Sequence, residues 1–236
     1  MFDGTQQRQA RRYPIQLPLF HRPVSSTVNR TRIGWTRDLS ETGACVELDR
    51  SMSAPTQLQV RFQTDREAID AEAEVVWVKE PVGSDGGTLH GLTFTKLARH
   101  QRQGLLRVLL AWGLTRRGGV RVPIEVAMTC EIKGSTGPSL QGQVRNGSRD
   151  GLLLRLPQVV SPGTTLEVSL LTQNGPLIAK GVVVWVAPPE GRTPGDLIQH
   201  GLRLTSLEWA AALALAGDLL RPLEDTPRFF HREGNV

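Results

Sequence analysis

An internal repeat is the feature that most constrains how this chain can fold. Residues 8–17 read RQARRYPIQL and residues 117–126 read RGGVRVPIEV, so one Arg-x-x-x-Arg pair precedes a Pro-Ile step twice. Two further residues, Trp77 and Trp185, stand 108 positions apart in similar valine-rich surroundings. Matched blocks in the same order and at nearly one offset indicate two copies of one domain.

The repeat predicts a domain over 1–114, a second over 115–222 and a flexible tail over 223–236. A chain of 236 residues is long enough to bury hydrophobic cores without disulfides or metals. Its two cysteines, Cys45 and Cys130, lack CxxC spacing and lie in apolar runs, so both are expected to be buried thiols.

Each copy has the pattern of a small β-rich domain. Short runs such as VEL and AEVVWV in the first copy, and LLLRL and GVVVWV in the second, are separated by turn residues. Their regular spacing predicts a mainly β protein of two tandem six-stranded antiparallel barrels. Helical spacing predicts a C-terminal helix in each copy, over 96–114 and 206–223, the second capped by Ser206.

Two recurring residue pairs have structural interpretations. Trp77 and Trp185 stand in the middle of valine-rich strands, so we expect their indoles to pack in the cores. His90 and His200 each stand alone beside a glycine at the start of a strand. A structural or exposed role is therefore expected for both histidines, rather than metal binding.

The charge of the chain is basic and unevenly distributed. The net charge is +5, and nearly all the positive charge comes from arginine. Arginine-rich codon usage explains such a composition as well as an anion-binding surface does. Seven arginines within 1–37 face only one acidic residue there, however, which predicts a local field that attracts anions.

Each arginine pair is followed by [Asp/Asn]-x-Ser-x-x-Gly, beginning at Asp38 in the first copy and at Asn146 in the second. A guanidinium can fork onto a phosphate or onto O6 and N7 of guanine. A carboxylate can accept from the N–H groups on the other guanine edge, and an amide oxygen can do part of this. Glycine permits a tight turn or a close backbone approach to a ligand. The combination suits a guanine-containing anion.

The arrangement resembles a PilZ domain, twice, over nearly the whole chain. This resemblance implies a receptor for the bacterial second messenger cyclic di-GMP. It implies a first site made of Arg8, Arg12, Asp38, Ser40 and Gly43. It implies a second site made of Arg117, Arg121, Asn146, Ser148 and Gly151.

One more arginine, Arg116, precedes the second motif, where the first copy has Gln7. In the resembling family an extra arginine here tends to accompany binding of a stacked ligand dimer, so Arg116 joins the expected second site. A cation at the carbonyl end of the preceding helix is the structural alternative, since it is favourable there in any case.

The expected function is therefore a cyclic di-GMP receptor that changes its interdomain arrangement and signals to a protein partner. No nucleophile–base pair or metal set stands out, so we expect no catalysis and no cofactor. No apolar run is long enough to span a bilayer and no signal peptide is evident, which favours a cytoplasmic protein.

Two other functions stay open. A basic barrel could bind single-stranded nucleic acid, although aromatic residues make up only 5% of the chain and leave few stacking surfaces. The barrels could instead form a ligand-independent adaptor for a partner protein, against which both complete motifs argue.

Overall fold

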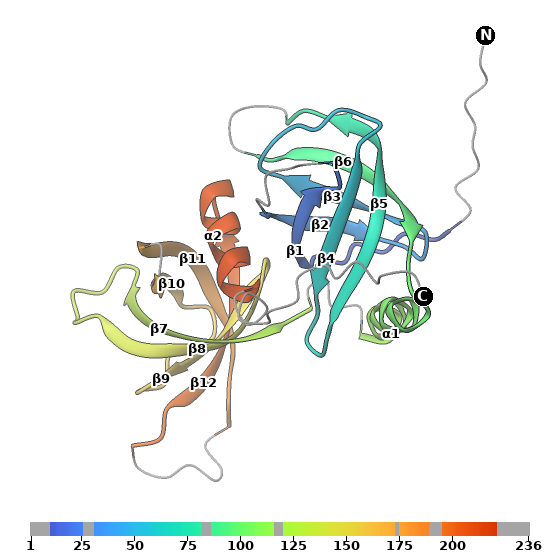
Figure 1. Ribbon diagram of the computed structural model, residues 1–236. Coiled ribbons are helices and arrows are strands. Elements are labelled where there is room, and N and C mark those ends of the chain that lie inside the picture. Colours follow the sequence, from blue (N-terminus) through green and yellow to red (C-terminus); the bar gives the residue numbers. More distant parts are fainter. Residues whose placement is uncertain are drawn as a thin grey trace.

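The structure, a computed structural model, describes residues 10–25, 31–81, 86–115, 120–172, 175–188 and 195–220. These residues form two closed six-stranded antiparallel β-barrels, each followed by a helix (Figure 1). The expected fold class is confirmed. None of the helices in the described ranges is long and apolar enough to cross a membrane.

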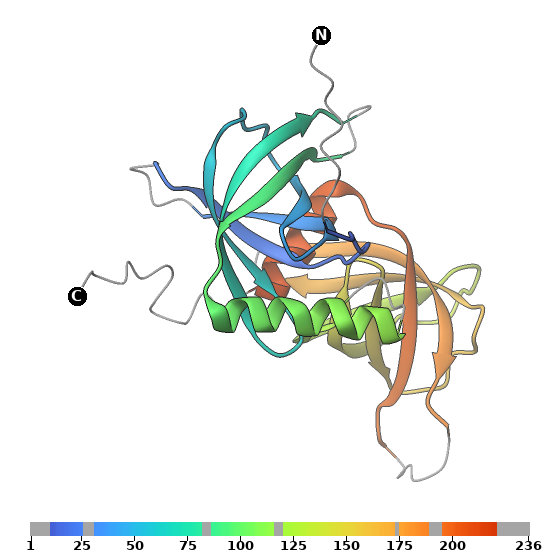
Figure 2. The same ribbon diagram turned by 90° about the vertical axis from the view of Figure 1, so that its right-hand side faces the viewer.

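The first barrel closes in the strand order β1-β2-β3-β6-β5-β4. Its strands are β1 (Pro18–Pro23), β2 (Arg32–Leu39), β3 (Gly43–Leu48), β4 (Gln57–Gln63), β5 (Ala68–Lys79) and β6 (Thr88–Lys96). Helix α1 (Arg99–Thr115) follows and lies against this barrel (Figure 2).

The second barrel has the same topology, with the order β10-β11-β12-β9-β8-β7. Its strands are β7 (Val122–Ile132), β8 (Leu140–Ser148), β9 (Gly151–Leu156), β10 (Thr165–Thr172), β11 (Gly175–Val186) and β12 (Ile198–Ser206). Helix α2 (Trp209–Leu220) follows. The expected Ser206 cap is wrong, because Ser206 is the last residue of β12 and α2 begins three residues later.

Alternation along each strand fills the barrel interiors. In β3, Ala44, Val46 and Leu48 point inward and are fully buried, while the residues between them face outward. Leu152 and Leu154 occupy the equivalent inward positions of β9. This period of two is what places the intervening side chains on the outer face.

The expectation that Trp77 and Trp185 pack in the cores is wrong. Val75 points inward, and continued alternation would have turned Trp77 inward as well. A β-bulge between Val75 and Trp77 adds one residue and moves the indole to the outer face, where Trp77 is 40% exposed. The same bulge precedes Trp185, which is 37% exposed.

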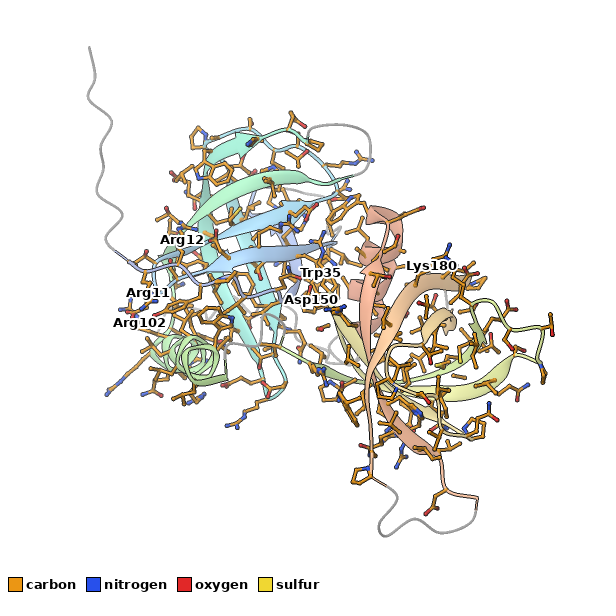
Figure 3. The ribbon with its side chains drawn as sticks, turned by 180° about the vertical axis from the view of Figure 1, so that it is seen from behind. Arg11, Arg12, Trp35, Arg102, Asp150 and Lys180 are labelled. Carbon is orange, nitrogen blue, oxygen red and sulfur yellow. The ribbon has the colours of Figure 1, made fainter. Side chains whose placement is uncertain are left out.

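Helix α2 joins the two barrels. Its residues Leu215 and Leu219 pack into the second core, while Phe20 and Trp35 of the first barrel belong to that same cluster. The Trp35 indole is fully buried, and its Nε1–H donates to the carbonyl oxygen of Ala212 at 2.8 Å. Figure 3 shows Trp35 on the side of the first barrel that α2 covers.

At the positions that match Trp35 and Phe20, the second barrel carries polar residues. Trp35 pairs with Glu47 across β2 and β3, and the matching pair in β8 and β9 is Gln143 and Arg155. Phe20 likewise corresponds to Thr129 by register. Because these positions are polar in the second copy, the contact between the copies is one-sided.

Candidate functional site

The first motif forms the hairpin between β2 and β3. Asp38 lies near the end of β2, Ser40 in the turn and Gly43 at the start of β3. The backbone N–H of Ser40 donates to the carbonyl oxygen of Gly43 at 2.9 Å, and its hydroxyl donates to the same oxygen at 3.0 Å. The buried serine therefore stabilises the turn that presents Asp38.

The motif glycines lie where a neighbouring strand leaves no room for a side chain. A Cβ on Gly43 would overlap the carbonyl oxygen of Leu92 in β6, and one on Gly151 would meet that of Leu202 in β12. Neither glycine is among those with a positive φ. Close approach between strands, which the absent Cβ permits, therefore accounts for both glycines in the fold.

Arg12, the second arginine of the first motif, lies beside Asp38 although the two are 26 residues apart. Tyr13 and Leu39 exchange backbone hydrogen bonds, each at 2.9 Å, and so attach the arginine segment to the end of β2. Arg12 Nη1 then donates to Asp38 Oδ1 at 2.6 Å (Arg12 is labelled in Figure 3). The side chains of this pair are 29% and 32% exposed, so a ligand can reach both.

Arg11, next to this pair, is exposed, and its guanidinium lies 5.3 Å from the centre of the Tyr13 ring. Tyr13 in turn packs edge-on against Trp112 of α1. These two ring contacts connect Arg11 and Tyr13 to helix α1, which ends the first copy.

A row of residues crosses the outer face of the first barrel at the level of Asp38. The register pairs Asp38 with Cys45, Cys45 with Gly91, and Gly91 with Trp77. The Trp77 indole lies so close to Gly91 that a Cβ there would overlap it. An ion-paired carboxylate thus stands at one end of the row and an exposed aromatic ring at the other.

The cysteine in this row is uncharged at neutral pH. Burial, and then the negative charge of Asp38, raise the pKa of Cys45 to about 11. Burial alone raises the pKa of Cys130 to about 11 as well. The expectation of two buried thiols is confirmed.

The second copy builds the same row from different residues. The register pairs Asn146 with Leu153, Leu153 with Gly201, and Gly201 with Trp185. The Asn146 side-chain oxygen is buried and has no hydrogen-bond partner among the described residues. This row therefore carries a neutral acceptor where the first row carries a carboxylate.

The remaining motif residues of the second copy also lie near this row. The Ser148 hydroxyl donates to the carbonyl oxygen of Gly151 at 3.3 Å, as Ser40 does in the first copy. Arg121 directly precedes Val122, which pairs with Gly147 next to Asn146. The other expected site residues, Arg8, Arg116 and Arg117, lie outside the described residues.

The tryptophans are the feature of these rows that the sequence interpretation missed. Their one signal is the glycine of the repeated His-Gly-Leu, which stands opposite each indole in the neighbouring strand. A glycine at a paired position leaves space above the sheet for a large ring, so Gly91 and Gly201 indicate that the opposite indoles lie on the outer face.

The two repeated histidines are structural, as expected. His90 Nε2 accepts from the backbone N–H of Met52 at 3.0 Å, and its Nδ1 faces the carbonyl oxygen of Thr88. His200 makes the equivalent contacts with Val160 and Ile198. Within the described ranges, no group of three or more His, Cys, Asp or Glu residues could hold a metal ion.

Fold and site together define a tandem-barrel protein with an arginine segment and an Asp/Asn-Ser-Gly hairpin in each copy. The PilZ domain profile matches residues 6–111 and 115–215, and the chain belongs to the PilZ family. A comparison with curated proteins finds no matching sequence.

Several solved structures are similar at low sequence identity. The Borreliella burgdorferi PlzA protein in complex with c-di-GMP is 12% identical, with 85% of this chain and 86% of that chain covered and a TM-score of 0.40. The MrkH–c-di-GMP complex of K. pneumonia is 12% identical, with 90% and 89% covered and a TM-score of 0.38. The PilZ domain of Escherichia coli YcgR with c-di-GMP is 17% identical, with 48% and 95% covered and a TM-score of 0.39.

Proposed function

We propose that this protein is a non-catalytic receptor for cyclic di-GMP with one binding site on each barrel. Membership of the PilZ family supports the ligand. The observation that carries the proposal is the position of Arg12, which the Tyr13–Leu39 bridge holds within 2.6 Å of Asp38 on an open face. Two groups complementary to guanine and phosphate thus meet on the barrel.

In the first site, Arg12 keeps further N–H donors besides the one on Asp38, because a guanidinium carries five. These donors suit a phosphate oxygen, or O6 and N7 of guanine. The Asp38 carboxylate accepts from the N–H groups on the other guanine edge, and the exposed Trp77 ring provides a surface on which the base stacks.

In the second site, the buried Asn146 oxygen is the group that accepts from guanine, since it has no hydrogen-bond partner among the described residues. A neutral amide accepts fewer N–H bonds from guanine than a carboxylate does, but it adds no negative charge beside a dianionic ligand. Ser148 and Gly151 set the turn, as Ser40 and Gly43 do in the first site.

Arginines outside the described residues complete both sites in this proposal. Arg8 stands four positions before Arg12, and Arg117 four positions before Arg121. Arg116 joins the second site, where one more guanidinium offsets the phosphate charge of a stacked pair of ligands. The downstream target in this proposal is a protein partner.

Calorimetric titration of the full chain with cyclic di-GMP tests this function. Arg12→Ala should weaken the first site and Arg121→Ala the second, each lost charge-assisted bond costing about 1.5–3 kcal/mol. Arg12→Lys should also weaken binding, because an ammonium cannot reproduce a planar fork.

Arg66 serves as the matched control, since it is an exposed arginine in the turn between β4 and β5. Arg66→Ala removes the same charge and should leave both affinities unchanged. Equal losses in Arg66→Ala and Arg12→Ala would show unspecific attraction by positive charge. Wild-type protein that takes up no ligand would refute the proposed function.

A further inference from the structure

The carboxylate of Glu47 lies between the two motifs. Glu47 is on the outer face of β3, two residues beyond Cys45, and its side chain is only 8% exposed. Its Oε2 lies 2.6 Å from Arg149 Nη1 and 3.5 Å from Arg37 Nη1, while its Oε1 accepts from the backbone N–H of Gly87 at 3.1 Å. One buried carboxylate therefore contacts two arginines and one backbone amide.

Both arginines belong to the motif hairpins. Arg37 directly precedes Asp38 and is the extra residue of the bulge between Thr36 and Asp38. Arg149 stands in the turn of the second motif, between Ser148 and Gly151. Glu47 thus connects Arg37, the residue just before the first motif, with Arg149 in the turn of the second motif.

The Arg149 contact is the more firmly held of the two. Its side chain is 17% exposed, and its guanidinium lies 5.5 Å from the centre of the Trp209 ring of α2. Arg37 is farther from the carboxylate and 45% exposed. A partly buried ion pair is screened less by solvent and salt than an exposed one, so Arg149 is the stronger partner and Arg37 the exchangeable one.

The two arginines share a single oxygen, Oε2 of Glu47. When a phosphate at the first site binds Arg37, this arginine leaves Glu47, and Oε2 then contacts Arg149 alone. The turn from Ser148 to Gly151 is then held more firmly beside Asn146. The reverse also holds, because coupling between two binding equilibria is reciprocal.

We propose that Glu47 is a positioning residue that couples the two candidate sites, so that ligand bound at one raises the affinity of the other. This inference rests on the proposed function. It adds a residue outside both motifs and a direction of coupling between the barrels.

The test compares second-site affinity for cyclic di-GMP with the first site filled and with the first site disabled. Full-length Arg12→Ala/Asp38→Ala protein gives the affinity of the second site with the first site disabled. The second binding phase of the wild type gives its affinity with the first site filled. We expect the second site to bind cyclic di-GMP at least about 5-fold more tightly when the first site is filled. This factor is the lower end of typical coupling between two binding sites. Glu47→Gln, which keeps the shape and removes the charge, should abolish this difference while both sites still bind.

Arg149→Gln removes the same contact from the other barrel and provides a second variant should Glu47→Gln fail to fold. A residue with only a structural role would change the melting temperature and leave the affinity ratio as it is. The deciding measurement is therefore the ratio of the two second-site affinities, with the first site filled and with it disabled.

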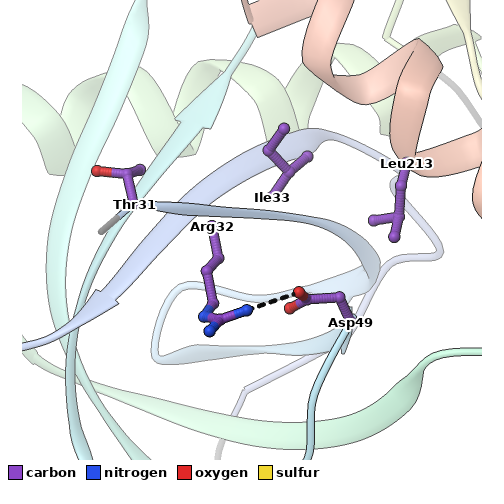
Figure 4. A pocket seen from close by; sticks show the side chains of 5 residues that line it. All are labelled: Thr31, Arg32, Ile33, Asp49 and Leu213. Carbon is purple, nitrogen blue, oxygen red and sulfur yellow. Dashed lines mark hydrogen bonds and ion pairs between the residues drawn. The ribbon is translucent and has the colours of Figure 1, made fainter. Parts of the chain in front are cut away.

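Asp49 provides the matched control, because it lies just beyond β3 at the same interface. Its Oδ2 is 2.9 Å from Arg32 Nη1, and the pair lines a pocket of about 240 Å³ together with Leu213 of α2 (Figure 4). Arg32 belongs to neither motif, so Asp49→Asn should keep the ratio.

A ratio that persists in both Glu47→Gln and Arg149→Gln overturns the coupling, as does its loss in Asp49→Asn. Wild-type sites that bind with equal affinity whether or not the other is filled overturn it too, and leave the proposed function intact. Absence of any binding by the wild type removes the proposed function itself.

Discussion

Gly43 shows how a residue of a binding motif can be required by the fold. Replacing it with alanine places a methyl group against the carbonyl oxygen of Leu92, and a backbone oxygen cannot rotate away. We expect Gly43→Ala to lower the free energy of unfolding by roughly 1–3 kcal/mol, as overpacking does. Thermal unfolding monitored by circular dichroism measures this loss.

Gly113 in α1 is the control for that substitution, because nothing lies within 4 Å of where its Cβ would be. Gly113→Ala should stabilise the protein by about 0.5–1 kcal/mol, since alanine is the better helix former. A Gly43→Ala protein as stable as the wild type would show that β3 and β6 can move apart.

His21 should make the protein sensitive to acid. Its ring on β1 is fully buried, and neither nitrogen has a hydrogen-bond partner among the described residues. Asp49 Oδ1 lies 3.9 Å away, too far for a hydrogen bond. Burial lowers the pKa of His21 from 6.5 to about 4, with Arg32 and His90 acting in the same direction and Asp49 against it.

Because the pKa is lower in the folded state, the unfolded chain binds more protons at pH values between about 4 and 6.5. The contribution of neutral, buried His21 to the free energy of unfolding is therefore fully present above pH 6.5, and it is lost as the pH falls toward about 4. The shift corresponds to a loss on the order of 3 kcal/mol. Urea unfolding at about pH 7 and about pH 4.5 measures it.

His21→Leu should flatten this pH dependence, because leucine does not titrate. Part of the slope should remain, since burial also lowers the pKa of His90. Equal slopes in His21→Leu and wild-type protein would show that another group is responsible.

At the scale of elements, the bulge in β5 determines which side chains border the first candidate site. It places Val76 and Trp77 both on the outer face, 48% and 40% exposed. Trp77 lies in the row with Asp38, so Trp77→Ala should weaken first-site binding of cyclic di-GMP by roughly 1–3 kcal/mol, the usual contribution of a base stacked on an aromatic ring.

Val76→Ala is the control, since it removes exposed apolar surface from the same bulge without removing a ring. Titration of both variants in an Arg121→Ala background isolates the first site. Equal affinities for Trp77→Ala and Val76→Ala would exclude stacking on the indole.

The two helices differ where it matters for packing between the barrels. Leu105 and Leu109 of α1 face their own barrel, as Leu215 and Leu219 of α2 do. Near the first barrel, α2 presents small apolar residues such as Ala212, whose carbonyl accepts from Trp35. The position of α1 that matches Ala212 when the leucines are aligned is Arg102, which is exposed (Figure 3). The matching position of α1 thus carries a charged side chain where α2 has a small residue against the first barrel.

At the scale of the whole molecule, the interface adjoins both candidate sites. Arg149 and Trp209 of the second copy pack against Glu47 and Gly87 of the first. A ligand with different affinities for two arrangements of the barrels shifts the equilibrium between them, and a ligand that binds arginines near these contacts would have such a difference. We therefore expect cyclic di-GMP to change the small-angle scattering profile of the full chain.

Arg12→Ala/Arg121→Ala protein is the control for that measurement, because it should scatter alike with and without ligand. A wild-type profile that is identical at saturation would contradict rearrangement while leaving binding unaffected.

The sequence by itself determined the two copies, their strands, the closing helices and the buried cysteines. These follow from repetition and from alternation of apolar residues, which are properties of short stretches of chain. The resemblance carried by the motifs also placed Arg12 and Asp38 in one expected site. The structure brings these two side chains together as an ion pair, and their contact with a ligand stays a prediction.

The tertiary structure alone decided the rest. Trp77 faces outward because one extra residue in β5 reverses the alternation, and such a bulge depends on how β6 pairs with it. Glu47 and Arg149 are 102 residues apart, and they meet because Phe20 and Trp35 offer α2 an apolar surface. A periodic pattern records which side chains share a face of one element. It does not record which face another barrel will cover, since that depends on the shape and apolar area of both surfaces together.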